Sequence, residues 1–223
     1  MSGNIAPNIV NNGLVLCLDA ANTKSYVSGS TTWMDLSRSG INGTLTNGPI
    51  FSSTNGGSIM FDGVDDYVST NYNTALNNFT VCVWFRVPDS TNAAARRILD
   101  KNYITGFWLG KNTSGAANSW GGGVLESSPP YGRYLTLTDS QWHFLTSIRS
   151  GTTHTLYGDG ITNTTSGTVS STALNTENLF IGIENGGSLQ QLKGNIAQIL
   201  IYNRDLSITE VLQNYNATKA RYI

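Results

Sequence analysis

The sequence carries little charge, and its charges are not clustered. Asp, Glu, Lys and Arg make up 12% of the 223 residues, about half the share that is usual in soluble domains. The formal net charge is −1 and no run of Lys and Arg occurs, which argues against nucleic acid as a partner because phosphate binding needs clustered cations. Gly, Asn, Ser and Thr take the place of the charged residues, and such hydroxyl- and amide-rich surfaces suit particles, secreted proteins and adhesins.

Cysteine is scarce, and long apolar runs are missing. Cys17 and Cys82 each lie within a short apolar run, so we expect two buried free thiols that act as small hydrophobic residues; a disulfide across the fold is the alternative. Two cysteines do not make up a metal site. The N-terminus lacks a basic segment followed by a long apolar one, so we expect no signal peptide, no membrane insertion and synthesis in a cytoplasm.

The length and the spacing of turn residues favour a single all-β domain. Residues 1–12 are polar and are predicted to form an N-terminal arm or linker, and residues 13–223 to form the domain. A domain of this size buries roughly 70% of its unfolded surface and needs no disulfide or metal to fold. Short β-type runs alternate with Gly, Asn, Ser and Pro clusters. The predicted strands are 13–19, 41–45, 58–61, 67–70, 79–87, 98–101, 106–110, 119–126, 132–138, 142–149, 153–157, 179–183 and 194–202.

One helix is predicted, near the C-terminus. Ser207 and Glu210 have the spacing of a capping box, and apolar residues follow at helical spacing, so the helix should cover about residues 208–218. The strand 194–202 should be central, with Ile196, Leu200 and Tyr202 on one face and Ile199 and Ile201 on the other. These elements predict a two-sheet antiparallel jelly-roll sandwich with one short C-terminal helix.

The stretch from Phe61 to Val68, Phe-Asp-Gly-Val-Asp-Asp-Tyr-Val, is the most informative motif. It resembles the strand pair of laminin-G-like domains in the concanavalin A-like lectin/glucanase superfamily, and five further segments resemble that family in the same order over residues 13–217. The segments 18–22 and 202–217 resemble stand-alone versions found in tailed-phage virion proteins. Fold resemblance alone does not establish function.

The resemblance implies a non-catalytic virion surface protein, such as a capsid or tail decoration or fibre component. The expected partners are a virion capsid or tail protein and a host surface glycan, and the expected state on the particle is a homo-oligomer. Two alternatives stay open, namely a carbohydrate-binding adhesin module and a glycoside hydrolase of the same fold.

Calcium is the best metal candidate, because Ca²⁺ prefers carboxylate and amide oxygens. The positions that resemble metal-bearing relatives are Asp35, Asn42, Asp62, Asp65 and Asp66. The alternative is that these acids fix turns by accepting backbone N–H bonds. The family commonly has an acid where this chain has Ala197, which removes one ligand.

Aromatic side chains could form a platform for a sugar. Trp33, Trp84 and Trp142 occupy motif positions and are expected in the core. The residues expected on loops, where they could contact a ligand or partner, are Trp108, Trp120, Tyr131 and Tyr134, together with Arg133 beside the Pro129–Pro130 pair.

Catalytic residues are hard to assign. Glycosidases use paired carboxylates, but the only glutamates are Glu126, Glu177, Glu184 and Glu210, and none has the expected strand spacing. His143 begins a strand in the family and is expected to be structural, whereas His154 lies in a polar hairpin and is expected to be exposed. We therefore predict that the protein is not an enzyme.

Overall fold

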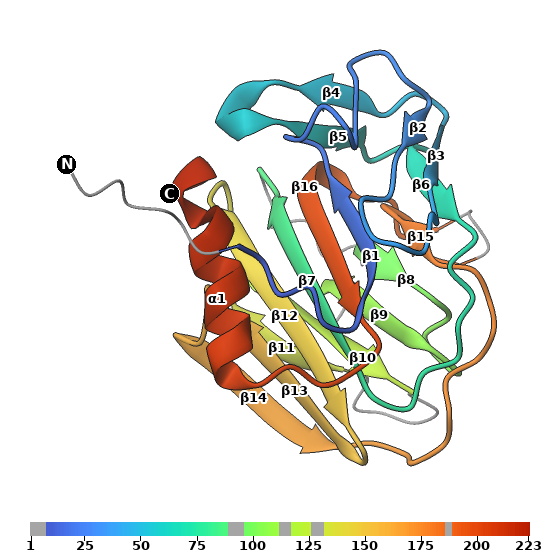
Figure 1. Ribbon diagram of the computed structural model, residues 1–223, viewed down its shortest axis with the longest axis vertical. Coiled ribbons are helices and arrows are strands. Elements are labelled where there is room, and N and C mark those ends of the chain that lie inside the picture. Colours follow the sequence, from blue (N-terminus) through green and yellow to red (C-terminus); the bar gives the residue numbers. More distant parts are fainter. Residues whose placement is uncertain (1–7, 89–95, 112–116, 126–131, 186–188) are drawn as a thin grey trace.

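The computed structural model describes residues 8–88, 96–111, 117–125, 132–185 and 189–223. Two antiparallel eight-stranded sheets pack face to face, and one helix covers the outer face of one of them (Figure 1). The predicted fold class is therefore confirmed. Within the described residues, no helix has the length and apolar character needed to cross a membrane.

The first sheet, called sheet A, has the order β14-β13-β12-β7-β16-β5-β4, and β1 pairs with the free part of β16. Its strands are β1 (Leu14–Asp19), β4 (Ile50–Ser52), β5 (Ser58–Asp62), β7 (Phe79–Arg86), β12 (Trp142–Ser150), β13 (Thr153–Gly158), β14 (Asn163–Thr168) and β16 (Lys193–Tyr202). The longest apolar runs of the sequence lie at its centre, in β7, β12 and β16, because these strands are buried on both faces.

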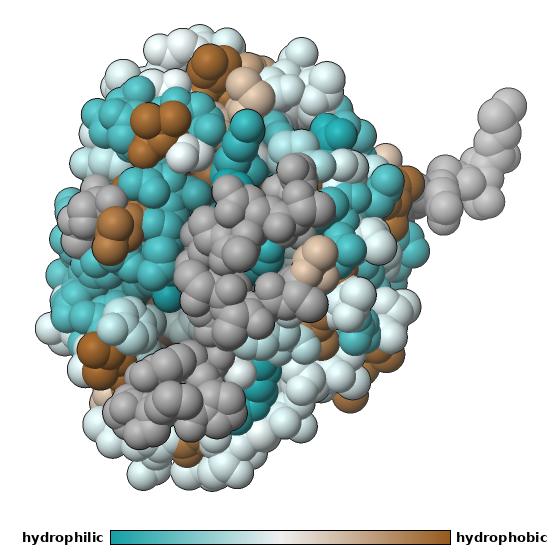
Figure 2. Space-filling model, turned by 180° about the vertical axis from the view of Figure 1, so that it is seen from behind, coloured by the Kyte–Doolittle hydropathy of each residue, from teal (hydrophilic) through white to brown (hydrophobic). Residues whose placement is uncertain are grey.

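The second sheet, called sheet B, has the order β11-β10-β9-β8-β15-β6-β3-β2. Its strands are β2 (Thr32–Trp33), β3 (Gly43–Thr46), β6 (Tyr67–Thr70), β8 (Arg96–Asp100), β9 (Phe107–Lys111), β10 (Ser119–Val124), β11 (Arg133–Thr136) and β15 (Phe180–Ile181). Figure 2 shows the molecule from behind, where polar residues predominate and apolar residues form small separate patches.

The fold has two apolar layers. The larger layer fills the space between the sheets and includes Trp33 and Phe61. The smaller layer lies between sheet A and α1 (Ile208–Thr218) and includes Trp84 and Trp142. Trp84 stacks on Tyr215 of the helix, with ring centroids 5.7 Å apart, and its indole N–H donates to Thr218 Oγ1 at 2.8 Å. The expected core positions of the three motif tryptophans are confirmed.

The start and the extent of α1 agree with the prediction. The Ser207 hydroxyl accepts from the Glu210 N–H, and the Glu210 carboxylate accepts from the Ser207 N–H, which completes the capping box. Arg204 also donates to the Glu210 carboxylate, at 3.0 Å through one of its nitrogens. This contact lowers the pKa of Glu210 to about 2.

The predicted faces of β16 need one correction. A β-bulge between Ile196 and Gln198 inserts an extra residue, and such an insertion reverses the alternation beyond it. Ile196 therefore lies in the layer between the sheets with Ile199 and Ile201, whereas Leu200 lies under the helix. The central position of β16, between β7 and the pair β1 and β5, is as predicted.

Residues 8–12 are not a free arm, which corrects part of the predicted boundary. Val10 is buried, its N–H donates to Asn214 Oδ1 at 2.8 Å, and its carbonyl accepts from the Tyr202 hydroxyl at 2.9 Å. The segment thus lies along α1 and β16. Residues 1–7 are outside the described part of the chain.

Candidate functional site

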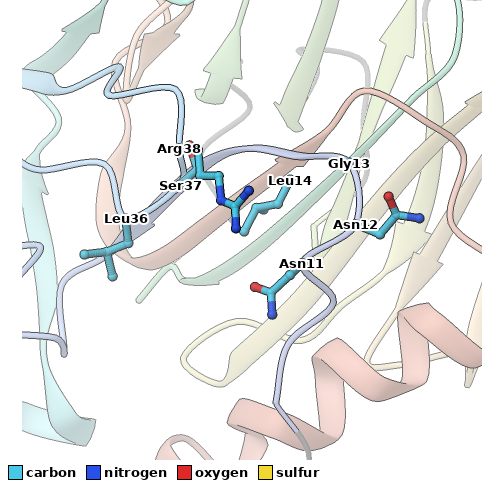
Figure 3. Close-up of a pocket in the computed structure, with 7 residues that line it drawn as sticks. All are labelled: Asn11, Asn12, Gly13, Leu14, Leu36, Ser37 and Arg38. Carbon is cyan, nitrogen blue, oxygen red and sulfur yellow. The ribbon is translucent and has the colours of Figure 1, made fainter.

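A groove runs along β1 on the outer side of sheet A, between β1, α1 and the segments on either side. Its first chamber, of about 620 Å³, lies between Asn11–Leu14 and Leu36–Arg38 (Figure 3). Its second chamber, of about 320 Å³, lies between β1 and the C-terminal end of α1. Asn11, Leu14 and Leu36 line both chambers, so the two chambers adjoin each other, and together we call them the β1 groove.

One wall of the β1 groove is held by Asp35. Its carboxylate accepts four hydrogen bonds, from the backbone N–H groups of Cys17, Ser37 and Ile41 and from the Ser37 hydroxyl, at 2.6–3.0 Å. The Asp35 N–H donates to Asn42 Oδ1 at 2.9 Å. Asp35 and Asn42, which resemble metal ligands in the sequence, thus fix the loop that carries the groove wall, and the four donors occupy the acceptor positions of the carboxylate.

The opposite wall is the segment 8–12. Its carbonyl groups are held by side chains from the end of the chain, with Gln213 Nε2 donating to the Asn8 carbonyl at 2.7 Å and Arg204 Nε donating to the Asn12 carbonyl at 3.0 Å. The side chain of Asn11 is exposed at the groove rim. This wall is therefore set by contacts between segments far apart in the sequence.

The floor of the second chamber is polar and buried. Arg221 donates to both carboxylate oxygens of Asp19, at 3.0 and 2.8 Å, and Gln198 Nε2 donates to Asp19 Oδ2 at 3.1 Å. Gln198 is 2% exposed, and its Oε1 has no hydrogen-bond partner among the described residues. Burial raises the pKa of the Cys17 thiol, which also lines this chamber, to about 12. An unpaired buried acceptor is costly, so this oxygen is suited to accept from a bound molecule.

Sequence reasoning missed Arg38, Gln198 and Arg221. A signal did exist for Gln198, because it is the one amide within the apolar run from Ile196 to Tyr202. A lone polar residue in a buried strand needs a partner. Arg38 and Arg221 had no such signal, because only the fold brings their loop and helix end to β1.

The acidic motif forms a compact cluster at the turn between β5 and β6. Carboxylate oxygens of Asp62, Asp65 and Asp66 lie within 4.8 Å of one another. Asp66 Oδ2 accepts from the Asp62 N–H at 2.9 Å and Asp62 Oδ1 accepts from the Val64 N–H at 2.7 Å. Burial raises the pKa of Asp66, and the neighbouring acids contribute to the shift. Two of the oxygens therefore fix the turn.

The expected loop aromatics do not form a surface platform. Trp108 and Trp120 lie in β9 and β10 and are 2% and 1% exposed, so their expected exposure on loops is wrong. Trp108 instead packs under the Arg97 guanidinium, 4.1 Å from its ring centroid, and against Tyr134. Tyr134 is half-buried in β11, and Tyr131 lies outside the described residues.

Arg133 and His154 form an internal polar contact. His154 is fully buried, which corrects its expected exposure, because it lies in β13 and not in the turn before it. Arg133 donates to His154 Nδ1 at 3.3 Å, so Nδ1 is an acceptor and the ring proton sits on Nε2, which donates to Ser147 Oγ at 2.9 Å. Burial and nearby cations lower the pKa of His154 to about 3. A histidine that donates to the hydroxyl cannot remove its proton, so this pair is not set up as a nucleophile and base.

His143 is held between two acceptors. Nδ1 lies 2.8 Å from Asp159 Oδ2 and Nε2 lies 2.6 Å from the Thr138 carbonyl. Burial favours the neutral ring, but these hydrogen bonds outweigh it and raise the pKa of His143. Both ring nitrogens are occupied as donors, which agrees with the expected structural role.

Two of the described glutamates, Glu177 and Glu184, accept hydrogen bonds from amide side chains. Glu177 accepts from Asn102 and Asn185, and Glu184 accepts from Gln190 at 2.8 Å. Glu184 also borders a small hollow, of about 90 Å³, beside Asp100. Burial raises the pKa of Asp100 to about 6, although its ion pair with Arg97 opposes the shift. Glu126 lies outside the described residues.

Known structures of the same architecture include both binding domains and enzymes. Superposition gives a TM-score of 0.70 with the receptor binding domain of botulinum neurotoxin type G (14% identity, 92% of this chain and 51% of that chain). It gives 0.67 with the binding domain of Paraclostridial mosquitocidal protein 1 (16% identity, 92% and 52%). It gives 0.69 with Trypanosoma rangeli sialidase (14% identity, 98% and 36%).

These identities establish the shared fold alone, and the chain spans about half or less of each of these structures. A comparison with curated protein sequences gives no match. The family model described as the concanavalin A-like lectin/glucanases superfamily matches residues 62–212, which is more than half of the chain. The chain therefore belongs to the concanavalin A-like lectin/glucanases superfamily.

Proposed function

We propose that the protein is a non-catalytic glycan-binding protein and that the β1 groove holds the sugar. The observation that carries the proposal is the mixture of side chains in the groove, where the amides of Asn11, Asn22 and Gln198 lie beside Leu14 and Leu36. A sugar hydroxyl both donates and accepts, and an amide side chain does the same. Leucine side chains suit the apolar C–H surface of a sugar ring.

The surroundings of Ser147, His154 and Glu210 support binding without catalysis. The Ser147–His154 pair has the wrong proton arrangement for a nucleophile and base. Glu210 belongs to the helix cap and has a pKa of about 2, whereas a general acid needs a pKa near the working pH. Hydrolysis of a bound glycan by the pure protein would contradict this part of the proposal.

We place the protein on the surface of a virion, as a homo-oligomeric decoration or fibre component attached to a capsid or tail protein. This placement rests on the resemblance of segments 18–22 and 202–217 to phage virion proteins and on the low content of charged residues in the chain. Mass spectrometry of purified particles should detect the chain, and particles that lack it would refute the placement. Capsid and tail genes beside its gene would support it.

Glycan binding can be tested with the intact chain on a glycan array, with and without Ca²⁺. Asn11→Trp should fill the groove, because Asn11 is exposed and lines both chambers. Asn216→Trp, on an exposed position of α1, is the matched control. We expect the wild type and the control to bind the same glycans and N11W to lose at least tenfold in affinity. No binding by the wild type, or equal binding by N11W, would refute the proposal.

A further inference from the structure

We propose that the β1 groove binds an acidic oligosaccharide in one orientation, with its carboxylate at Arg38 and its neutral hydroxyl groups at Gln198. The inference rests on the proposed function, because it assigns a ligand class and a direction to the same groove. It is carried by one feature in each chamber, a cation in the first and a buried acceptor in the second, neither of which has a partner among the described residues.

The cationic end is formed by Arg38. The side chain is exposed, and none of the described residues forms a hydrogen bond or ion pair with its guanidinium. Figure 3 shows it reaching over the first chamber toward Leu14. The loop beneath it is fixed by the four hydrogen bonds to Asp35, so the guanidinium is carried on a rigid support. A planar guanidinium pairs with a carboxylate through two parallel hydrogen bonds.

The other end of the groove favours neutral hydroxyl groups. The charge of Asp19 is matched by Arg221, which donates to both of its oxygens. Gln198 Oε1 is left as a buried acceptor without a described partner. A carboxylate placed against this oxygen would be repelled, whereas a hydroxyl group can donate to it. The floor therefore accepts the uncharged part of a sugar.

The charges along the groove give the ligand its direction. The residues that line it include two arginines, Arg38 and Arg221, and one aspartate, Asp19, while the Asp35 carboxylate behind the wall is already occupied by four donors. Because Arg221 and Asp19 are paired, the cation left to meet a ligand is Arg38. An acidic sugar is thus attracted to one end only.

The size of the groove suits more than one sugar ring. The chambers measure about 620 and 320 Å³, each within the roughly 300–1,000 Å³ that is common for ligand sites. A ligand that reaches both Arg38 and Gln198 must extend through both chambers, which share Leu14 and Leu36. An oligosaccharide has this extended form.

A peptide is disfavoured by the edge of β1. A bound strand would need free backbone groups at that edge. The N–H of Cys17 already donates to Asp35 at 2.8 Å and its carbonyl accepts from the Leu36 N–H at 2.8 Å. The centre of the edge is therefore closed to an added strand, and the ligand must be recognised by side chains.

The test compares an oligouronic acid tetrasaccharide with its carboxyl-reduced form by titration calorimetry with the intact chain. We expect the acid to bind more tightly, with an affinity that falls as salt rises. Arg38→Gln should lower the affinity for the acid roughly tenfold to hundredfold and leave the reduced form unchanged. Lys193→Gln, which removes a charge from an exposed position at the start of β16, should change neither. Gln198→Met should weaken both forms.

The outcomes separate this inference from the proposed function. Equal affinity for the acid and its carboxyl-reduced form would overturn the assignment of the carboxylate to Arg38, and so would an R38Q variant that binds the acid as the wild type does. Neither result would contradict glycan binding itself. Binding of neither form, together with no binding of any glycan by the wild type on the array, would overturn both. Binding of an acidic peptide in place of the saccharide would also overturn both. Because Arg38 is exposed, R38Q should fold as the wild type does. Its result therefore stands even if Q198M fails to fold.

Discussion

The carboxylate of Asp35 accepts a hydrogen bond from the backbone N–H of Cys17 at 2.8 Å and so ties a loop to the outer edge of β1. This contact closes the edge strand, and a closed edge does not recruit other strands. It also positions Leu36–Arg38 as a wall of the groove. Asp35, which the sequence pattern suggests as a metal ligand, therefore has a structural role that involves no metal.

Replacing Asp35 should destabilise the protein and distort the groove. Asp35→Ala removes the acceptor of four hydrogen bonds, and we expect a loss of about 2–3 kcal/mol in the free energy of unfolding. Urea unfolding followed by tryptophan fluorescence measures this loss. Asp65→Ala, at an exposed acid, is the control and should change stability by under about 0.5 kcal/mol. A loss for D35A that appears only when Ca²⁺ is present would support a metal role instead.

The acidic turn should stabilise the fold with or without calcium. Asp66→Ala removes the acceptor of the Asp62 N–H, and we expect a loss of roughly 1–2 kcal/mol. The melting temperature should be the same in EDTA and in millimolar Ca²⁺, because two of the clustered oxygens already fix the turn. A rise in melting temperature with Ca²⁺ that disappears in Asp65→Asn would instead establish this cluster as a calcium site.

The fold was predictable from local patterns where those patterns decide the structure. Alternating and continuous apolar runs marked the central strands, and Ser207 with Glu210 marked the start of the helix. The missed strands lack such patterns. β14 (Asn163–Thr168) is an edge strand of small polar residues, and β2 and β4 are only two and three residues long.

The candidate site was less predictable than the fold, because tertiary contacts create it. The groove joins residues near positions 11, 38, 198 and 221, and no local pattern reports their proximity. The error at Ile196 has a similar origin, since a bulge in β16 reverses the side-chain alternation. His154 appeared exposed because its neighbours are polar, yet its strand turns it into the interior.

The two histidines should give stability a maximum near pH 6.5. The pKa of His154 is lowered from 6.5 to about 3, so the unfolded chain binds the proton first and stability falls as pH drops from 6.5 toward 3. The pKa of His143 is raised, so its contribution is present below pH 6.5 and is lost as pH rises through the folded pKa. Urea unfolding at a series of pH values measures both effects.

Single substitutions separate the acid and alkaline sides of this dependence of stability on pH. His154→Asn should reduce the slope on the acid side by up to about 1.4 kcal/mol per pH unit. His143→Asn should reduce the loss of stability on the alkaline side and leave the acid side unchanged. Identical pH profiles for the wild type and H154N would show that His154 is not buried as a neutral ring.

The two cysteines should be unreactive thiols in the native protein. Cys17 and Cys82 are 4% and 0% exposed, both are free, and burial raises the pKa of each thiol from 9.0 to about 12. Because the thiolate is the reactive form, the shift alone should slow labelling by a thiol reagent about a thousandfold at pH 8. Labelling in 6 M guanidinium without reductant should modify both residues, and mass spectrometry gives the number of labels on the chain. If neither residue is labelled in guanidinium until a reductant is added, the two cysteines form a disulfide instead. Rapid labelling of Cys17 alone in the native protein would show that the second chamber of the β1 groove opens to solvent.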